Sequence, residues 1–293
     1  MKILITGASG FFGRELLHHI DINNSEVHIL SNVQEIPHAN FINHSLNLHS
    51  QEDINSIMKL VKPSHLVHLA WYAKPPEFWH SKENLKWLDS SLSLFKSFVS
   101  NGGSHAVVAG TCAEYGFDTK DYYEKNNNLL PQTLYGKTKL KLNQELFSLA
   151  KECGFSLTWM RLFFPYGRGE DPKKFLSSIA NNLMRNEMAV CNNANLIRDY
   201  IHISDAARAC NKLLEESFHG VVNIGTGQGS NLGDMAKLAA KILNKENNLV
   251  LKNIDNSSKE NAIIANIDVL SSLGWKPEMS LNFGIQDLIS SIK

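Results

Sequence analysis

The length and composition of the chain fit a globular protein with a substantial hydrophobic core. Its 293 residues are 43% hydrophobic and 20% charged, and Lys plus Arg equal Asp plus Glu in number, so the formal net charge is +0. This balance provides no basic surface field for nucleic acid or for an anionic membrane, and we expect neither as a partner.

Predicted strands and helices alternate along the first part of the chain. The predicted strands are Lys2–Thr6, Glu26–Ser31, Ser64–Ala70, Ser104–Gly110 and Phe155–Leu162, and the predicted helices are Gly10–Ile22, Gln51–Val61, Glu83–Ser100 and Gln132–Cys153. Nearly continuous apolar strands separated by helices are typical of a parallel sheet covered on both faces. The pattern predicts an α/β fold with a doubly wound, Rossmann-type parallel sheet.

The alternation loosens after Phe164, where glycines and prolines cluster, and we expect a smaller mixed C-terminal lobe there. Two later runs, Ile197–Ile203 and Val221–Ile224, have the composition of buried strands and predict a return to the main sheet. The expected division is a dinucleotide-binding domain of residues 1–163 plus 197–224 and a substrate lobe of residues 164–196 plus 225–293.

Targeting signals and metal motifs are not evident. The N-terminus lacks a basic segment followed by a long apolar run, and no later run approaches membrane-spanning length, so we expect a cytoplasmic protein. The cysteines have no metal-ligand or redox-pair spacing and are expected to be reduced thiols; they are Cys112, Cys153, Cys191 and Cys210. The histidines are scattered, so no metal is expected.

Three glycines, Gly7, Gly10 and Gly13, follow the first predicted strand at a spacing of three. Gly7 would let the chain turn off the strand, Gly10 would let backbone amides approach a pyrophosphate, and Gly13 would let the helix pack on the sheet. The loop predicts binding of a nicotinamide dinucleotide; a glycine-rich turn that binds nothing is the alternative. The other expected cofactor contacts are Ser9, Phe11, Phe12, Ser31, Asn32, Asn47, Leu48, Leu69 and Ala70.

The end of the second predicted strand lacks the acidic residue that binds the adenine ribose hydroxyls in NAD-preferring sites. This absence favours NADP(H), with NAD(H) as the alternative. No arginine follows directly to bind a 2′-phosphate, so Ser31, Asn32 or Arg14 would have to contribute. Asn47 follows the third strand, where a polar side chain could meet the adenine.

Tyr135 and Lys139 lie four residues apart in a predicted helix and therefore share one face. An ammonium near the phenol would lower the pKa of Tyr135 from its usual value of about 10. Thr111 lies where the fifth predicted strand ends, which is the edge at which ligands of this fold bind. The three residues predict a catalytic set that oxidises or reduces a carbinol, although Tyr135 and Lys139 alone would be unremarkable as surface residues.

These motifs resemble those of extended short-chain dehydrogenases/reductases of the NAD(P)-dependent nucleotide-sugar epimerase/dehydratase/4-ketoreductase family. The matching pieces span nearly the whole chain and are Thr6–Gly13, His68–Ala70, Asn84, Thr111 before Tyr115–Gly116, Tyr135–Lys139, Arg161–Gly167, Arg198–Asp205, Asn223–Gly225 and Leu273–Trp275. The resemblance implies that Lys139 also holds the nicotinamide ribose and that Arg198 binds the diphosphate of a sugar nucleotide, a task that suits a planar guanidinium. A salt bridge from Arg198 to Asp199 or Asp205 is the alternative. A homodimer formed through the two long helices, residues 83–100 and 132–153, is also implied.

Two departures from the family pattern narrow the expected reaction. Dehydratases of the family carry an Asp-Glu pair directly after the catalytic threonine, whereas this chain has Cys112 and Ala113. Glu114 would face the other way on an extended strand and is expected to be structural. Phe164 stands where retaining epimerases usually have an asparagine that contacts the substrate phosphates. These differences disfavour dehydration and weaken the case for epimerisation.

Aromatic residues are dense after the fourth predicted strand. Trp71, Tyr72 or Trp79 would stack on a sugar or a base, or else pack against neighbouring helices. The predicted substrate-binding residues are Trp71, Tyr72, Thr111, Cys112, Phe164 and Arg198.

The expected function is reduction of the C4 ketone of a nucleotide-activated 4-keto-6-deoxy sugar, for the synthesis of surface polysaccharide precursors such as those of lipopolysaccharide. The first alternative is a nucleotide-sugar 4-epimerase with tightly bound NAD. A second alternative is a cofactor-sensing regulator that keeps the fold without catalysis. The presence of Thr111, Tyr135 and Lys139 argues against this regulator.

Overall fold

The structure of the protein is a computed structural model that describes residues 1–31, 40–116, 122–126, 128–253 and 262–292. The chain divides into two compact units. Unit 1 comprises Met1–Gly116, Leu129–Arg161 and Ala207–Val222, and unit 2 comprises Phe117–Asn128, Leu162–Ala206 and Asn223–Lys293. The assignment of cofactor binding and substrate binding to separate domains stays a prediction.

Unit 1 is built on a parallel sheet. The strands are β1 (Lys2–Thr6), β2 (Glu26–Ser31), β3 (Phe41–Ser45), β4 (His65–His68), β5 (His105–Thr111), β6 (Ser156–Leu162) and β11 (Gly220–Ile224). Their order in the sheet is β11-β6-β5-β4-β1-β2-β3. The strand β1 pairs in parallel with β2 and β4, and the same direction continues to β3 and β5. The predicted doubly wound fold is confirmed.

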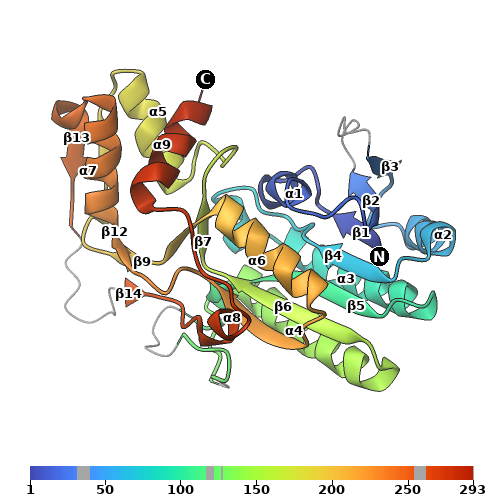
Figure 1. Cartoon of the computed structure of the whole chain (residues 1–293). Coiled ribbons are helices and arrows are strands. Elements are labelled where there is room, and N and C mark those ends of the chain that lie inside the picture. The colour runs from blue at the N-terminus through green and yellow to red at the C-terminus, as the bar shows by residue number, and fades with distance from the viewer. Residues whose placement is uncertain (32–39, 117–121, 127, 254–261, 293) are drawn as a thin grey trace. The chain divides into compact units, whose positions relative to one another are not determined.

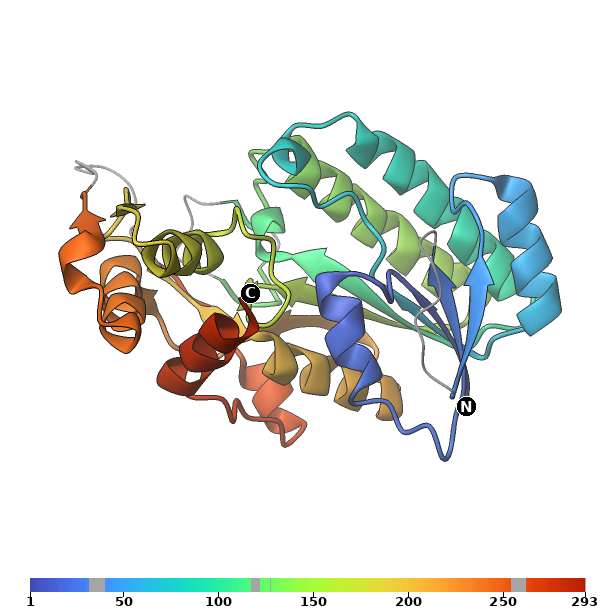
Figure 2. The same ribbon diagram turned by 90° about the horizontal axis from the view of Figure 1, so that it is seen from above.

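Helices cover both faces of this sheet. They are α1 (Phe11–Leu17), α2 (Gln51–Val61), α3 (Glu83–Ser100), α4 (Leu134–Cys153) and α6 (Ile203–Glu215). Figures 1 and 2 show α2, α3 and α4 along one face and α1 along the other. This arrangement places the start of α4, which carries Tyr135, near the turn that follows β5.

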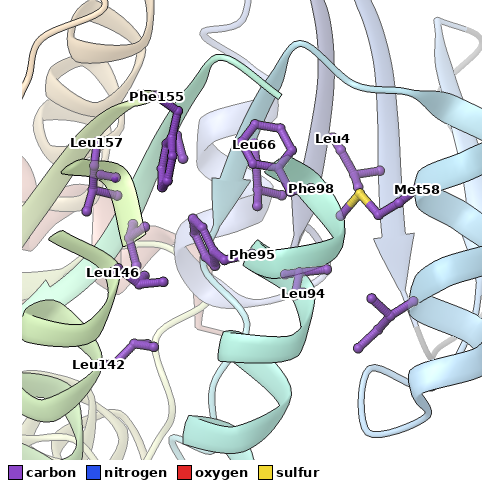
Figure 3. Close-up of a cluster of buried hydrophobic side chains, with 14 of the residues drawn as sticks. Leu4, Met58, Leu66, Leu94, Phe95, Phe98, Leu142, Leu146, Phe155 and Leu157 are labelled. Carbon is purple, nitrogen blue, oxygen red and sulfur yellow. The ribbon is translucent and has the colours of Figure 1, made fainter. Parts of the chain in front are cut away.

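The largest side chains of the unit 1 core come from this helical layer and the strands beneath it. Leu142, Leu146 and Ala150 recur every four residues on α4 and are buried with Phe95 and Phe98 of α3 (Figure 3). Side chains at this spacing lie on one helical face, so their burial holds α4 at a fixed rotation. Tyr135 and Lys139 are part of the same helix and are therefore held in a fixed direction.

Local capping explains where the helices begin and end. Thr133 accepts a hydrogen bond from the Gly136 amide at 3.1 Å and caps the start of α4, and Gly154 closes its end at φ 74°. The helix predicted over Gly10–Ile22 ends earlier, at Leu17, because the His18 amide bonds to the Glu15 carbonyl and tightens the last turn. Ile20 is nevertheless buried. Its spacing from the preceding apolar residues therefore indicated a buried side chain correctly, but did not indicate a helix.

Unit 2 is mixed and contains short strands in small sheets. Its strands are β7 (Phe164–Tyr166), β8 (Ala189–Cys191), β9 (Ile197–Arg198), β10 (Tyr200–His202), β12 (Ser230–Asn231), β13 (Leu249–Leu251) and β14 (Ala262–Ile263). Its helices are α5 (Phe175–Met184), α7 (Leu232–Leu243), α8 (Asp268–Ser272) and α9 (Leu281–Ser291). Residues of α5, α7 and α9 share one hydrophobic core with β8.

The expected return of Ile197–Ile203 to the main sheet is wrong, whereas that of Val221–Ile224 is confirmed through β11. Asp199 interrupts the first of these segments, so β9 pairs with β12 and β14 while β10 pairs with β7. Ile203 already begins α6. Apolar composition predicted burial correctly but could not indicate which sheet would provide it.

The described residues contain no helix that is long and apolar enough to span a membrane. All four cysteines are free thiols; Cys112, Cys191 and Cys210 are buried and Cys153 is exposed. Within the same part of the chain, no group of His, Cys, Asp or Glu side chains is arranged to hold a metal ion. The expected cytoplasmic location stays a prediction.

Replacing Leu146 by Ala should lower the free energy of unfolding by about 2–5 kcal/mol, because it leaves a cavity under a fully buried side chain. Urea unfolding followed by circular dichroism measures the change. Leu60→Ala is the matched control, since Leu60 is 73% exposed and should cost little. Equal losses for the two variants would contradict the described position of α4.

Candidate active site

The glycine loop after β1 has the close backbone packing that its sequence predicts. Gly7 has φ +75°, and a Cβ added there would lie 2.6 Å from the Ala70 amide nitrogen. A Cβ on Gly13 would lie 2.2 Å from the Gly7 carbonyl oxygen, so only glycine lets α1 approach the loop. A Cβ on Gly10 would meet only that carbonyl oxygen, at 3.2 Å, and is otherwise in open space. The loop therefore presents bare backbone on its open side, which fits a dinucleotide pyrophosphate.

The residues beside the loop are less uniform. Ser9 uses its carbonyl to accept a hydrogen bond of 2.8 Å from Arg14 Nη1, and Phe11 and Phe12 form the first turn of α1. Leu69 and Ala70 follow β4 and lie against Gly7. These positions are consistent with the predicted cofactor contacts, which stay predictions.

Of the residues expected at the adenine end, Ser31 lies in β2, and Asn47 and Leu48 follow β3. Ser31 ends β2 and is buried, and Asn32 lies outside the described residues. Asn47 is exposed, and its side-chain oxygen accepts from the His49 amide at 3.0 Å. Leu48 is partly buried against the core. The preference for NADP(H) over NAD(H) also stays a prediction.

A buried hydrogen-bond chain supports the loop, and apart from the match at His68 no sequence pattern indicates it. The Thr6 hydroxyl lies 2.7 Å from His68 Nδ1, and His68 Nε2 lies 2.9 Å from the Ser91 hydroxyl. The Thr6 hydroxyl accepts a hydrogen bond from the Ala70 amide, so its own proton can be donated to His68 Nδ1. The Ser91 hydroxyl donates to a backbone carbonyl, so it accepts from His68 Nε2. All these bonds are satisfied by a neutral imidazole that carries its proton on Nε2. Burial, with a smaller effect of Lys139, lowers the pKa of His68 to about 3 and keeps it neutral.

The three predicted catalytic residues gather in unit 1. Thr111 ends β5, and its side chain accepts a hydrogen bond of 3.2 Å from the Ala113 amide. Tyr135 and Lys139 extend from the first turns of α4. Lys139 is buried and donates through Nζ to the Ala109 carbonyl at 2.8 Å. Thr111, Tyr135 and Lys139 thus lie at the carboxyl end of β5, as the sequence predicts for a Rossmann-type site.

The expected lowering of the Tyr135 pKa by Lys139 is not found in the structure. Burial raises the pKa of Tyr135 well above its usual value, and hydrogen bonding with the Thr111 side chain opposes this rise only in part. The Lys139 ammonium instead contacts the Ala109 carbonyl and the Trp71 ring, whose centroid lies 3.8 Å from Nζ. Tyr135 is consequently a neutral phenol at physiological pH, suited to donate a proton.

Lys139 has the opposite shift. Burial lowers its pKa from 10.5 to about 7, and the negative charge of Glu114 acts against this lowering. Near neutral pH the ammonium therefore exchanges easily with the neutral amine. The catalytic region is one in which burial, and not the Tyr-Lys spacing, sets both pKa values.

The aromatic segment, residues 71–79, covers this catalytic set. Phe78 and Trp79 meet the Tyr135 ring edge to face, with centroids 5.0 Å and 5.8 Å away. Trp71 covers Lys139 and donates its indole N–H to the Asn84 side-chain oxygen at 2.8 Å. Packing within the protein, one of the two alternatives for these aromatic residues, is therefore present.

Asn84 holds the aromatic segment in place. It is fully buried at the start of α3, and its amide donates to the Phe78 and Ser81 carbonyls at 2.7 Å and 2.8 Å. A single asparagine in a helix carries no signal of such a role. Tyr72 is directed elsewhere, since its hydroxyl donates to Glu77 at 2.9 Å. Binding of substrate by Trp71 and Tyr72 stays a prediction.

Glu114 does not lie on an extended strand, as the sequence predicted, but in a turn. The extended strand ends at Thr111, and Cys112–Glu114 form a 3-10 turn. Within this turn Cys112 is buried and Glu114 is fully buried in an ion pair with Arg161, whose Nε lies 2.9 Å from the carboxylate. The extended geometry expected for Glu114 is therefore wrong, and its structural role stays a prediction.

In unit 2 the two predicted phosphate-contact positions lie together. The Arg198 guanidinium carbon is 5.9 Å from the centroid of the Phe164 ring. The neighbouring carboxylate of Asp199 accepts bonds from the Thr226 hydroxyl and amide and from the Gly227 and Ala265 amides. Asp199 therefore stabilises the surrounding backbone. Diphosphate binding by Arg198 stays a prediction.

A Rossmann-type sheet with a glycine loop and a Thr-Tyr-Lys cluster defines the class of short-chain dehydrogenases/reductases. The model of the NAD dependent epimerase/dehydratase family matches residues 3–225 of the chain. The chain belongs to this family, and the enzyme type inferred from the resemblance, a nicotinamide-dependent extended short-chain dehydrogenase/reductase, is confirmed.

Individual relatives differ in their reactions. A dTDP-4-dehydro-6-deoxyglucose reductase of Escherichia coli is 26% identical, over 99% of this chain and 97% of the reductase. A UDP-glucose 4-epimerase of Bacillus subtilis (strain 168) is also 26% identical, over 84% of this chain and 83% of the epimerase. The crystal structure of a UDP-glucose 4-epimerase with UDP-glucose from Thermotoga maritima has a TM-score of 0.88 at 23% identity, covering 99% of this chain and 98% of the other.

Replacing Lys139 by Met should stabilise the cofactor-free protein at low pH. The folded-state pKa of Lys139 is about 7, against 10.5 for an ordinary lysine, so the unfolded chain binds more protons between these values. The cost of the buried ammonium is complete below pH 7 and falls as the pH rises toward 10.5. We expect a gain in unfolding free energy of about 1–4 kcal/mol at pH 6 that shrinks by pH 10.

Urea unfolding at several pH values measures this gain. Lys137→Met is the control, because Lys137 lies on the same helix with an exposed side chain. Its unfolding should keep the pH dependence of the wild type. A Lys139→Met protein that is less stable than the wild type at pH 6 would contradict the burial of the ammonium.

Proposed function

We propose that the protein reduces the C4 ketone of a nucleotide-activated 4-keto-6-deoxy sugar, using NADPH or NADH. The observation that carries the proposal is the turn after Thr111, where Cys112 and Ala113 occupy the places of the acid-base pair that dehydratases need. Ala113 has no group that could transfer a proton, and Cys112 offers a buried thiol in place of a carboxyl, so the acid-base pair is missing. The Escherichia coli reductase, similar over nearly its whole length, supports the proposal.

The side chains of unit 1 account for the proton transfer in this reaction. The dinucleotide, when bound, supplies the hydride to the ketone carbon. Tyr135 donates its phenolic proton to the ketone oxygen, a role that suits a phenol held neutral by burial. Thr111 accepts from the Ala113 amide, so its own proton remains for the Tyr135 oxygen or the substrate oxygen. Lys139 holds the ribose and replaces the proton that Tyr135 gives up.

A cavity in unit 2 supports binding of the nucleotide part of the substrate. It has a volume of about 290 Å³, and its lining includes Lys173 just before α5, Phe175 at the start of α5, Val190 of β8, and Asn192 and Asn193. An aromatic ring with nearby amide groups can bind a base by stacking and hydrogen bonding. Arg198 follows this segment and is proposed to bind the diphosphate.

The alternative function is a nucleotide-sugar 4-epimerase with tightly bound NAD, in which the same residues remove a hydride and return it to the other face of the sugar. The similarity to the Bacillus subtilis epimerase, at the same 26% identity, favours this alternative. Phe164 weakens it, because its ring packs beside Arg198 where retaining epimerases have an amide side chain.

Two further features belong to the proposal. NADP(H) is the preferred cofactor, since no carboxylate ends β2 at Ser31. The protein forms a homodimer through α3 and α4, which pack against each other in unit 1. The product serves the synthesis of surface polysaccharide precursors such as those of lipopolysaccharide.

Replacing Tyr135 by Phe should lower kcat for 4-keto sugar reduction by about 10²–10⁴-fold, because it removes the proton donor and keeps the ring. The assay follows oxidation of NADPH or NADH with UDP-, dTDP-, GDP- and CDP-linked 4-keto-6-deoxy sugars. Tyr123→Phe is the matched control, since Tyr123 is 41% exposed and lies outside the catalytic set. Near-full turnover by Tyr135→Phe would contradict the proposed role.

Release of bound cofactor distinguishes the reductase from the epimerase. The purified protein is denatured and its supernatant is analysed for dinucleotide. A reductase should release little, because its cofactor exchanges at every turnover. Stoichiometric NAD, together with interconversion of UDP-sugars and no net oxidation of NADPH, would support the epimerase and contradict the proposed reductase.

A further inference from the structure

The turn that follows the catalytic strand is closed by the side chain of Glu114. One carboxylate oxygen of Glu114 accepts a hydrogen bond of 2.9 Å from the Thr111 amide, while the Thr111 hydroxyl accepts from the Ala113 amide at 3.2 Å. The two bonds form a reciprocal capping box around the 3-10 turn. Because both act on Thr111, they fix the backbone and the hydroxyl of this residue together.

The carboxylate is itself held from the neighbouring strand β6. Trp159 donates its indole N–H to the two carboxylate oxygens at 3.0 Å and 3.1 Å, and Arg161 Nε donates at 2.9 Å. The exposed fractions of Glu114, Trp159 and Arg161 are 0%, 0% and 2%. A buried ion pair held by several hydrogen bonds has one strongly preferred geometry, because each displaced bond would leave a buried polar group without a partner.

Two glycines make room for this arrangement. A Cβ on Gly110 would lie 2.2 Å from Trp159 Nε1 and 2.7 Å from a Glu114 carboxylate oxygen. A Cβ on Gly136, next to Tyr135, would lie 2.6 Å from the Ala113 carbonyl oxygen. The turn is therefore packed directly against the start of α4, and its position determines how Thr111 faces Tyr135.

We propose that Glu114 is a positioning residue for the ketone reduction: clamped by Arg161 and Trp159, it fixes the Thr111 hydroxyl toward Tyr135 and places a negative charge behind the catalytic set. The role rests on the proposed function, since it concerns the same Thr111, Tyr135 and Lys139. It goes beyond packing, because the carboxylate acts on the orientation of one reacting hydroxyl and on the charge of its neighbours.

The charge of Glu114 has a defined direction of effect. It acts to raise the pKa of both Lys139 and Tyr135. For Lys139 this opposes the larger effect of burial, which lowers the pKa. For Tyr135 it adds to the larger effect of burial, which raises the pKa. Removing the charge should lower both pKa values. The high-pH loss of activity, where Lys139 loses its proton or Tyr135 ionises, should then occur at a lower pH.

The first test uses hydrogen exchange and needs no substrate. Glu114→Ala removes the acceptor of the Thr111 amide, so this amide should exchange at least about tenfold faster, measured relative to the Val108 amide inside β5. Leu146→Ala is the control, because it destabilises unit 1 through α4 without touching the turn. In that variant the ratio of the two exchange rates should equal the wild-type ratio.

The second test measures catalysis in Glu114→Gln, which keeps an acceptor for the Thr111 amide and loses the charge. We expect kcat to fall by about 10–100-fold while KM for dinucleotide and for sugar nucleotide changes less than about threefold. The high-pH limb of the kcat profile should move to lower pH. Leu60→Ala, which changes an exposed side chain of α2, should keep the wild-type kcat and limb.

A stability cycle tests the coupling of Glu114 to Lys139 without any turnover. At pH 6 the substitution Lys139→Met is made in two backgrounds, the wild type and Glu114→Gln, and the fold-decrease in the unfolding constant is measured in each. The fold-decrease should be about three times larger, or more, in the Glu114→Gln background. The reason is that the ammonium loses the opposing charge that offsets its burial.

The outcomes separate this inference from the proposed function. Turnover of none of the four 4-keto sugars by the wild type would contradict the proposed function, and hydrogen exchange and the stability cycle would still decide the role of Glu114. Wild-type behaviour of the Thr111 amide in Glu114→Ala, with equal ratios in the cycle, overturns the inference. A kcat and pH limb in Glu114→Gln that match those of the wild type overturn it as well.

Discussion

Burial of one ammonium group at the carboxyl edge of the sheet constrains the rest of the catalytic region. Lys139 lies between the Ala109 carbonyl of β5 and the ring of Trp71, with almost no exposure to solvent. An unpaired charge in such a place is unfavourable, so it requires a carbonyl, an aromatic face and a distant carboxylate around it. The carbonyl belongs to β5 itself. The aromatic segment held by Asn84 provides the aromatic face, and the turn closed by Glu114 provides the carboxylate.

The repeating parts of the fold were predictable because they follow from local patterns. Alternating apolar strands and helices predicted the doubly wound sheet, including the long helix over Gln132–Cys153 that corresponds to α4. Residues 197–203 show the limit of this approach. Their composition indicates burial, but a strand of two or three residues is assigned to a sheet by its tertiary neighbours, which no local pattern contains.

Some features of the candidate site were likewise predictable from local sequence patterns, and others were not. Thr111, Tyr135 and Lys139 were predictable because a strand end and an i, i+4 spacing place side chains by backbone geometry alone. Their protonation states were not predictable, because the spacing of Tyr135 and Lys139 indicates that they are close together but not how far they are exposed to water. The contacts of Glu114 with Trp159 and Arg161 join residues about forty-five positions apart, and the chain of Thr6, His68 and Ser91 crosses three elements.

The protonation of the catalytic set bears on the choice between reduction and epimerisation. A reductase begins its cycle with a neutral phenol, whereas an epimerase must begin by accepting a proton from a sugar hydroxyl. Burial raises the pKa of Tyr135 and lowers that of Lys139 to about 7, so the phenol keeps its proton more readily than the ammonium does. In the proposed reduction a proton can therefore pass from Lys139 to Tyr135 after each turnover, which restores the phenol for the next one.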